Sequence, residues 1–153
     1  MSSESKTGLP GELDAGALCE TWGTPLYLYD ARVMQEQLAT FHAAFSNLPH
    51  RILYAAKALS TLAVLRLFRK EGTGLDAVSV EEIELGLRAG FRPTDILFTP
   101  SFPSAGDLER AAGLGARINI DSLSTLEKFS GCHGSNTACC LRLKPWLQAG
   151  ESS

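Results

Sequence analysis

The chain has 153 residues, which is enough for one domain with a hydrophobic core. Hydrophobic residues make up 44% and charged residues 20% of it, as in an ordinary globular protein, and no apolar run reaches the length of a membrane-spanning helix. The net charge of -3, with no aromatic residues interleaved among basic ones, argues against nucleic-acid binding.

The N-terminal third predicts two helices with a strand between them. Residues 1–10 are polar and lack the apolar stretch of a signal peptide, so we expect an unstructured lead in a cytosolic protein. A short helix is expected over 12–22, and the alternating segment 25–30 predicts a strand. Asp30 then occupies a helix N-cap position, and apolar residues at helical spacing predict an amphipathic helix over 31–46.

From residue 51 onward, short apolar segments alternate with helical ones. Strands are predicted at 51–57, 74–79, 95–100, 116–120 and 138–144, and helices at 61–72, 80–90, 105–113 and 122–129. This alternation with short connections is typical of β/α units around a parallel sheet. Because the strands are continuously apolar, we expect both faces of the sheet to be buried.

The five strands predict part of a barrel. A closed (β/α)₈ TIM barrel has eight strands and typically about 250 residues. The alternative, an open doubly wound sheet, requires a glycine-rich phosphate turn after the first strand, and residues 58–65 contain no glycine. We therefore predict an α/β fold with about five of the eight barrel strands. The expected organisation is a lead and short helix (1–22), a strand and helix (23–47) and the partial barrel (48–153).

The cysteines do not predict a metal site. They are Cys19, Cys132, Cys139 and Cys140. No Cys-x-x-Cys pair with a second ligand pair at matching distance is present. Reduced thiols are therefore expected, as in other cytosolic proteins.

Lys57 ends the first of the repeating strands, at the end where barrel enzymes have their active sites. On an extended strand, Leu53, Ala55 and Lys57 would share one face. An amine in an apolar wall loses hydration, which favours its neutral form and allows it to form a Schiff base. By position alone, a lysine that marks where the strand meets water is the simpler interpretation.

Two further charged residues lie within predicted strands. Asp76 lies where an apolar residue is expected, and a lysine on the neighbouring strand end would be a suitable partner. A strand-edge carboxylate that faces a loop is the alternative. Arg142 would either direct its guanidinium at an anionic cofactor group or extend into water at the strand end.

Two Ser-x-x-Glu patterns match the capping box of a helix start. The first runs from Ser79 to Glu82 and the second from Ser124 to Glu127. Capping explains Glu82 fully, so no chemistry follows from this residue by itself.

Six segments in register with the predicted strands and helices carry a family resemblance. They are WGTPLYLYD (22–30), RILYAAKALSTLAVLRLF (51–68), GLDAVSVEEIELGLRAGF (74–91), DILFTPSFPS (95–104), ARINIDSLSTLEK (116–128) and LRLKP (141–145). Together they resemble the N-terminal part of the diaminopimelate decarboxylase branch of the fold-type III decarboxylases, which use pyridoxal 5'-phosphate (PLP) and have a barrel of the alanine racemase type. Ornithine and arginine decarboxylases are more distant members. Residues 58–61 lack the Tyr-Gly-His-Gly run of the racemases themselves.

The resemblance implies roles for five residues. Lys57 would be the catalytic residue that binds PLP as a Schiff base. Asp76, Ser79 and Glu82 would lie around the cofactor, and Arg142 would lie near the oxygen substituent of its ring.

The chain also departs from the family pattern. Leu59 stands in place of an asparagine, Val80 and Glu81 in place of a small, glycine-rich pair, Pro103 in place of a lysine and Lys144 in place of an asparagine. The family's ring-stacking histidine, glycine-rich phosphate loop, acidic partner of the pyridine nitrogen and C-terminal β domain have no counterpart in these residues. In the family, the segment that matches 25–30 pairs into that separate β domain.

The resemblance predicts PLP-dependent decarboxylation of an amino acid. The preferred substrate is meso-diaminopimelate, converted to lysine in lysine biosynthesis, and the chain would be an N-terminal fragment that is inactive alone. A second copy or a complementing C-terminal fragment is the expected partner. The alternatives are a decarboxylase of the ornithine or arginine type and a non-catalytic half-barrel that acts as a binding module, since open strand edges favour pairing.

Overall fold

The structure is a computed structural model of the chain, and it describes residues 13–134 and 137–143. The chain divides into two compact units, residues 1–43 and 44–153. The described helices include none that is both long and apolar enough to cross a membrane.

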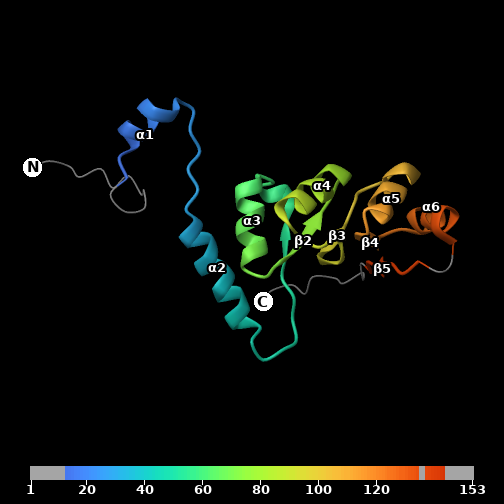
Figure 1. Ribbon diagram of the computed structural model, residues 1–153. Coiled ribbons are helices and arrows are strands. Elements are labelled where there is room, and N and C mark those ends of the chain that lie inside the picture. The colour runs from blue at the N-terminus through green and yellow to red at the C-terminus, as the bar shows by residue number, and fades with distance from the viewer. Residues whose placement is uncertain (1–12, 135–136, 144–153) are drawn as a thin grey trace, which may run out of the picture. The chain divides into compact units, whose positions relative to one another are not determined.

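The first unit contains two helices, as the sequence predicts (Figure 1). Helix α1 spans Ala15–Trp22 and ends at Gly23, whose φ of 81° favours glycine. Helix α2 spans Ala31–Ala44. The Asp30 carboxylate accepts the Arg32 N–H at 2.8 Å, which confirms Asp30 as the N-cap of α2.

The strand predicted at 25–30 is wrong for the part of the chain that the structure describes. These residues connect α1 to α2 without joining a β ladder, and Tyr27 is 81% exposed. Side-chain alternation is a local property of the sequence, whereas a strand also needs a second strand to take its backbone hydrogen bonds. The segment therefore has the pattern of a strand without the pairing.

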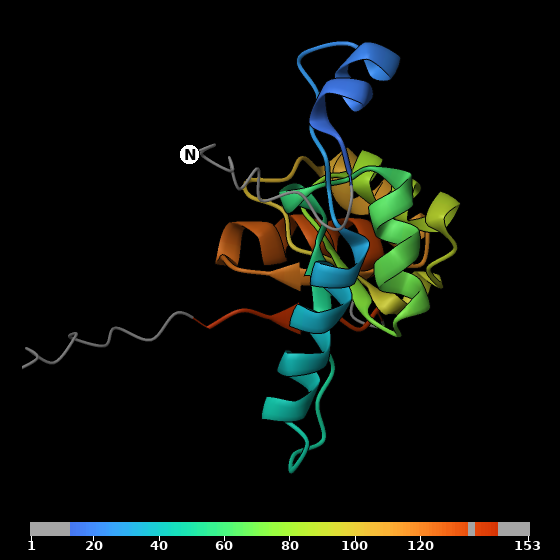
Figure 2. The ribbon, with the colours of Figure 1, turned by 90° about the vertical axis from the view of Figure 1, so that its left-hand side faces the viewer.

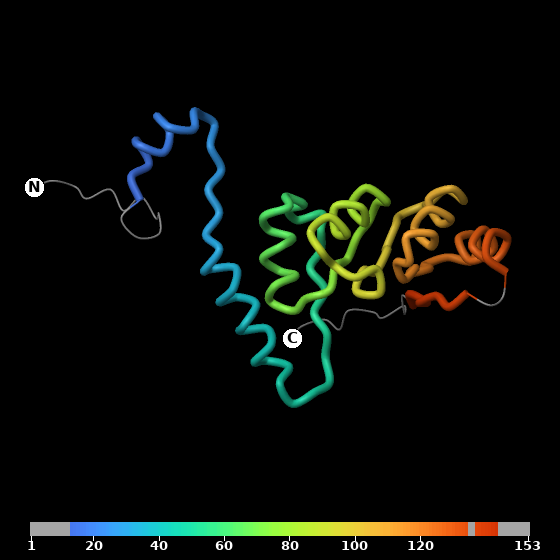
Figure 3. The backbone as a smooth tube through the Cα atoms, viewed as in Figure 1, coloured from blue at the N-terminus to red at the C-terminus, as the bar shows by residue number. Residues whose placement is uncertain are grey.

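The second unit is a sheet of five parallel strands with helices between them, which can be followed in Figure 1, Figure 2 and Figure 3. The strands are β1 (Leu53–Ala55), β2 (Gly74–Ala77), β3 (Ile96–Phe98), β4 (Arg117–Ile120) and β5 (Cys140–Leu141). The helices are α3 (Leu62–Lys70), α4 (Val80–Ala89), α5 (Ala105–Gly113) and α6 (Leu123–His133), with the 3₁₀ turns η1 (Ala56–Ala58) and η2 (Pro93–Asp95). The predicted alternation of strand and helix is confirmed.

The spatial order of the strands is the same as their order in the chain, β1-β2-β3-β4-β5. A doubly wound sheet reverses direction at a switch point, and this sheet does not. Unidirectional winding is the arrangement of a (β/α)₈ barrel, so the predicted partial barrel with five strands is confirmed.

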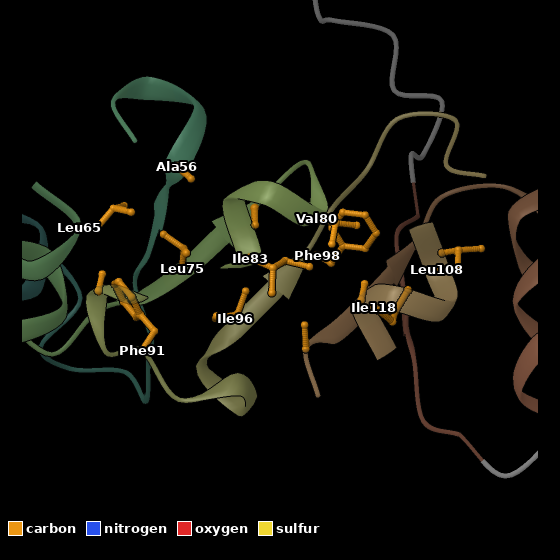
Figure 4. Close-up of a cluster of buried hydrophobic side chains, with 14 of the residues drawn as sticks. Ala56, Leu65, Leu75, Val80, Ile83, Phe91, Ile96, Phe98, Leu108 and Ile118 are labelled. Atoms are coloured by element: carbon orange, nitrogen blue, oxygen red, sulfur yellow. The ribbon is translucent and has the colours of Figure 1, made fainter. Parts of the chain in front are cut away.

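The helices pack in chain order on one face of the sheet, α3 against α4, α4 against α5 and α5 against α6 (Figure 1). Alternate strand residues fill the interface below them, including the fully buried Leu75, Ile96 and Phe98. Figure 4 shows these side chains in one buried cluster with Leu65, Ile83 and Leu108 from the helices. Burial of this apolar surface is the main stabilising contribution to the unit.

The opposite face of the sheet is only partly covered. Asp76, Leu97 and Asn119 alternate with the buried strand residues and are half-buried. The expectation that both faces are buried is therefore wrong for the described residues. In a barrel this face would be the interior, and five strands in an open sheet do not enclose it.

Serines begin three of the helices. Ser79 caps α4, Ser104 caps α5 in a complete capping box, and Ser122 caps α6 by accepting the Thr125 N–H at 3.2 Å. The box predicted from Ser124 to Glu127 is wrong, because α6 begins at Leu123 and its cap is the residue just before that position.

Candidate active site

The five residues singled out from the sequence all lie at or just beyond the carboxyl ends of strands. Parallel strands end at the same edge of a sheet, and the active sites of barrel enzymes are at this edge. Lys57 follows the last residue of β1 by two positions, and Asp76 is the penultimate residue of β2. Ser79 and Glu82 follow β2 at the start of α4, and Arg142 follows β5 directly.

Lys57 is the central residue of η1 and is exposed. Neighbouring residues fix this turn. Ala56 is fully buried, and the Tyr54 hydroxyl donates a 3.1 Å hydrogen bond to the Leu59 carbonyl on the far side of the turn. The Tyr54 ring stacks on Phe68 of α3, with 3.9 Å between the ring centroids. The backbone that carries Lys57 is therefore tied to the core while its amine faces solvent.

This position corrects two expectations. Lys57 does not lie on the strand, because β1 ends at Ala55 and the chain turns there. It also does not lie in an apolar wall, so the described residues do not desolvate its amine as the sequence argument supposed. Within the described residues, no hydrogen bond or ion pair engages this amine.

Asp76 lies beside β1, where its register partner is Ala55. Its carboxylate is half-buried and accepts a 2.5 Å hydrogen bond from the Thr99 hydroxyl, just after the end of β3. The lysine expected as its partner is therefore replaced by a threonine on the other neighbouring strand. Sequence reasoning missed Thr99, although its position directly after an apolar strand was the available signal.

Ser79 and Glu82 both stabilise the start of α4. The Ser79 hydroxyl accepts the Glu82 N–H at 3.2 Å, as predicted for a cap. The Glu82 carboxylate accepts the N–H of Val78 at 2.8 Å, one residue before the Ser79 N–H that a capping box would use. Both polar groups lie at the same sheet edge as Lys57 and Asp76, at the start of the helix that follows β2.

Arg142 is separated from the other four residues. Its backbone N–H donates a 2.7 Å hydrogen bond to the Ile120 carbonyl, which extends the pairing of β5 with β4, and its side chain is exposed. Three strand spacings of about 4.8 Å put β5 about 14 Å from β2 along the sheet. The structure thus groups Lys57, Asp76, Ser79 and Glu82 and leaves Arg142 at the far side of the open sheet.

The five parallel strands follow one another in one direction, as in a partial barrel. A solvent-facing lysine lies at the edge where barrel enzymes have their active sites. The chain belongs to the pyridoxal-dependent decarboxylases: residues 31–153 match the family's pyridoxal binding domain. The diaminopimelate decarboxylase of Methanothermobacter thermautotrophicus is 39% identical over 145 residues, which cover 94% of this chain and 34% of that protein. The resemblance inferred from the six segments is confirmed.

Solved structures agree with this assignment. The crystal structure of diaminopimelate decarboxylase from Helicobacter pylori complexed with L-lysine matches 78% of this chain and 30% of its own, with a TM-score of 0.73 and 32% identity. The lysine/ornithine decarboxylase from Vibrio vulnificus complexed with cadaverine matches 82% of this chain and 37% of its own, with a TM-score of 0.70 and 26% identity. The chain thus spans about a third of the length of these relatives.

Proposed function

We propose that this chain forms the lysine-bearing part of a PLP-dependent amino-acid decarboxylase and that Lys57 binds the cofactor. One observation carries the proposal: the Lys57 amine is exposed on a turn held by Tyr54, at the carboxyl edge of the sheet. The family match over residues 31–153 supports the choice of PLP.

The residues present suit this cofactor in their chemistry. A primary amine is the side-chain group that condenses with an aldehyde, and the Lys57 amine is accessible for that reaction. On the neighbouring strand, Asp76 retains acceptor capacity beyond its bond from Thr99. The Ser79 hydroxyl accepts a backbone N–H and still has its own proton to donate.

The bound cofactor would supply an electron sink for the electrons left when the substrate carboxylate departs as CO₂. Lys57 would attach the cofactor and hold a proton at Nζ. Asp76, Ser79 and Glu82 would orient the bound group, with Thr99 fixing the carboxylate of Asp76. We assign Arg142 to the oxygen substituent of the ring, a role that requires further strands to curl the sheet and bring β5 closer to β1.

We propose meso-diaminopimelate as the substrate of the whole enzyme, because relatives with this activity in their names align with 94% and 86% of the chain. A substrate of the ornithine type is the second candidate, supported by the similarity to the lysine/ornithine decarboxylase. A substrate panel assayed with the chain plus the remaining barrel of a relative separates the two.

The open edges of the sheet favour a partner. Within the described residues, β1 and β5 each pair on one side only. Unpaired edge strands expose backbone N–H and C=O groups that a further chain can bind. We propose a complementing C-terminal fragment or a second copy as that partner. A half-barrel that only binds such a partner is the non-catalytic alternative.

The test is reduction of the 153-residue polypeptide with borohydride in the presence of PLP, followed by peptide mass mapping. The proposal expects a pyridoxyl adduct at Lys57 that is lost in Lys57→Arg, which keeps the charge but cannot form the adduct. Lys70→Ala removes another exposed lysine and serves as the matched control. In this variant we expect labelling at Lys57 to equal that of the parent chain. Labelling spread evenly over the lysines, or none at Lys57, contradicts the proposal.

The same polypeptide is expected to release no CO₂ from meso-diaminopimelate without a partner. The separation of Arg142 from Lys57 and the exposure of the Lys57 amine are the physical reasons. Measurable release from the purified 153 residues would overturn this expectation, whereas activity restored by the missing barrel strands would support it.

A further inference from the structure

A hollow of about 390 Å³ lies at the edge of the sheet where the strands begin, opposite the edge that carries Lys57. Its lining comes from the residues just before β1, β2 and β3 and from the ends of α3 and α4. The lining residues are Arg51, Arg69, Gly72, Thr73, Gly90, Phe91, Arg92 and Asp95. Three arginines from three separate segments thus line one cavity.

Hydrogen bonds hold each guanidinium in place. Arg69 donates from Nε to the Gly90 carbonyl at 3.0 Å. Arg51 donates from Nη2 to Asp95 Oδ1 at 2.5 Å, and Arg92 donates from Nε to Asp95 Oδ2 at 2.7 Å. Each arginine uses only part of its five N–H donors in these bonds, so each keeps donors for a ligand.

The charges in the hollow do not balance. Arg51 and Arg92 bind the carboxylate of Asp95, whereas Arg69 binds a backbone carbonyl. Three guanidinium cations against one carboxylate leave two positive charges among the lining residues. Asp95 counts as a full negative charge at neutral pH, since its ordinary pKa of 3.8 already lies far below that pH and the hydrogen bonds from Arg92 and Arg51 lower that pKa further, to about 2. Glu71, which precedes Gly72 in the sequence, does not line the hollow.

The remaining lining groups offer little that would bind a cation or a neutral polar molecule. The Thr73 hydroxyl is used in a 3.0 Å hydrogen bond to the Phe68 carbonyl, and Phe91 is buried. The N–H of Gly90 is used in closing α4. The groups that remain available to a ligand are therefore mainly guanidinium N–H donors, whose geometry matches carboxylate and phosphate oxygens.

We propose that this hollow binds a dianionic phosphate group, either free or as the phosphate of a small ester. A phosphate carries about two negative charges at neutral pH and so compensates the surplus. The volume lies in the range of small-molecule sites and leaves room for an organic body attached to the phosphate. The site does not involve Lys57 or its neighbours, which lie at the other edge of the sheet.

The test is a calorimetric titration of the full chain with inorganic phosphate at pH 7.5 and low salt. The proposal expects saturable binding that weakens about tenfold or more in Arg69→Gln, since a charge-assisted contact is lost. Arg110→Gln removes an equal charge from a surface pair with Glu81 and Glu84 and serves as the matched control. Its phosphate affinity stays within about twofold of the parent chain.

Further variants and a second ligand separate loss of the site from loss of the fold and identify the kind of phosphate bound. Arg69→Lys keeps the charge and is expected to bind more tightly than Arg69→Gln, while circular dichroism checks that both variants fold. Lys57→Arg is expected to bind phosphate normally, which separates this site from the proposed cofactor lysine. Tighter binding of glycerol phosphate than of inorganic phosphate identifies an ester site, and equal binding identifies a free-phosphate site.

Two outcomes would overturn the proposal. One is the absence of saturable phosphate binding, or binding that Arg69→Gln leaves unchanged, in which case the arginines serve only to join the ends of the strands. The other is acetate binding as tightly as phosphate, which would show that the hollow does not select a dianion.

Discussion

The Thr99 hydroxyl donates a 2.5 Å hydrogen bond to the carboxylate of Asp76, from the end of one strand to the neighbouring strand. The Thr99 backbone N–H also continues the ladder to the Ala77 carbonyl at 2.8 Å. Among the described residues Asp76 has no ion-pair partner; instead, its carboxylate accepts the Thr99 hydroxyl and remains partly exposed on the open face of the sheet. The position of the Asp76 carboxylate therefore depends on the pairing of β2 with β3 and not on a contact with Lys57.

Replacing Thr99 by valine keeps the shape of the side chain and removes this bond. We expect the free energy of unfolding to fall by about 1 kcal/mol, because one hydrogen bond to a half-buried carboxyl group is lost. Urea unfolding measures the change. Thr94→Val, at an exposed position, is the control and is expected to have little effect. Equal losses in the two variants would show that the Thr99 bond contributes nothing specific.

The carboxylate of Asp95 makes stability depend on acid pH. The hydrogen bond from Arg92, with Arg51 adding to it, lowers the Asp95 pKa from 3.8 to about 2, although burial acts in the opposite direction. A lowered pKa means that stabilisation is complete above about pH 3.8 and is lost as the pH falls toward 2.

We expect this loss to be on the order of 1 kcal/mol, since Arg92 is largely exposed and solvent screens the pair. The free energy of unfolding, measured from pH 6 to pH 2, should therefore fall less steeply in Asp95→Asn than in the parent chain. Asp121→Asn, which removes an exposed carboxylate, should keep the parent slope. A parent-like slope in Asp95→Asn would refute the assignment of this titration to Asp95.

Ser79 stabilises the chain before any cofactor is bound. Ser79→Ala removes the acceptor for the Glu82 N–H and is expected to lower the free energy of unfolding by about 1 kcal/mol without PLP. Ser79→Asp restores a side-chain acceptor at the cap and should recover most of the loss. If Ser79→Ala were as stable as the parent chain in urea, the cap would be unimportant and a role confined to the cofactor would remain.

The element order was predictable because its signals are local. Helical spacing and closing glycines such as Gly90 mark helices whatever the rest of the chain does. The segment 25–30 shows the limit of such reasoning, because its alternation predicts a strand that needs a partner elsewhere in the chain. Helix α6 shows a similar limit, because Ser122 and Ser124 both suit a cap in the sequence and the structure has Ser122 there.

The edge of the sheet on which the candidate residues lie was predictable, whereas their contacts were not. The strand ends in the sequence locate Lys57 and Asp76 at one edge, since all strands of a parallel sheet end there. Their partners depend on register, which brings Thr99 to Asp76 and leaves the Lys57 amine facing solvent. Periodicity does not reveal that β1 stops at Ala55, because the turn that follows has the same apolar composition.

Gly86 tests how closely α4 packs on the sheet. A Cβ at this position would collide with the Leu75 side chain and lie 3.2 Å from Ile96 Cδ1, in the buried interface of α4 with β2 and β3. Alanine is favoured over glycine by about 1 kcal/mol in a helix interior, but overpacking a core costs about 1–3 kcal/mol. We therefore expect Gly86→Ala to lower the free energy of unfolding.

Gly113 provides the matched comparison. It is also helical, at the end of α5, but a Cβ there would meet no atom within 4 Å. Gly113→Ala should therefore leave the urea midpoint unchanged or raise it, with a gain of at most about 1 kcal/mol from helix propensity. If Gly86→Ala shifted the midpoint upward as Gly113→Ala does, α4 would have to lie farther from Leu75 than described, and the burial of Leu75 and Ile96 would need another explanation.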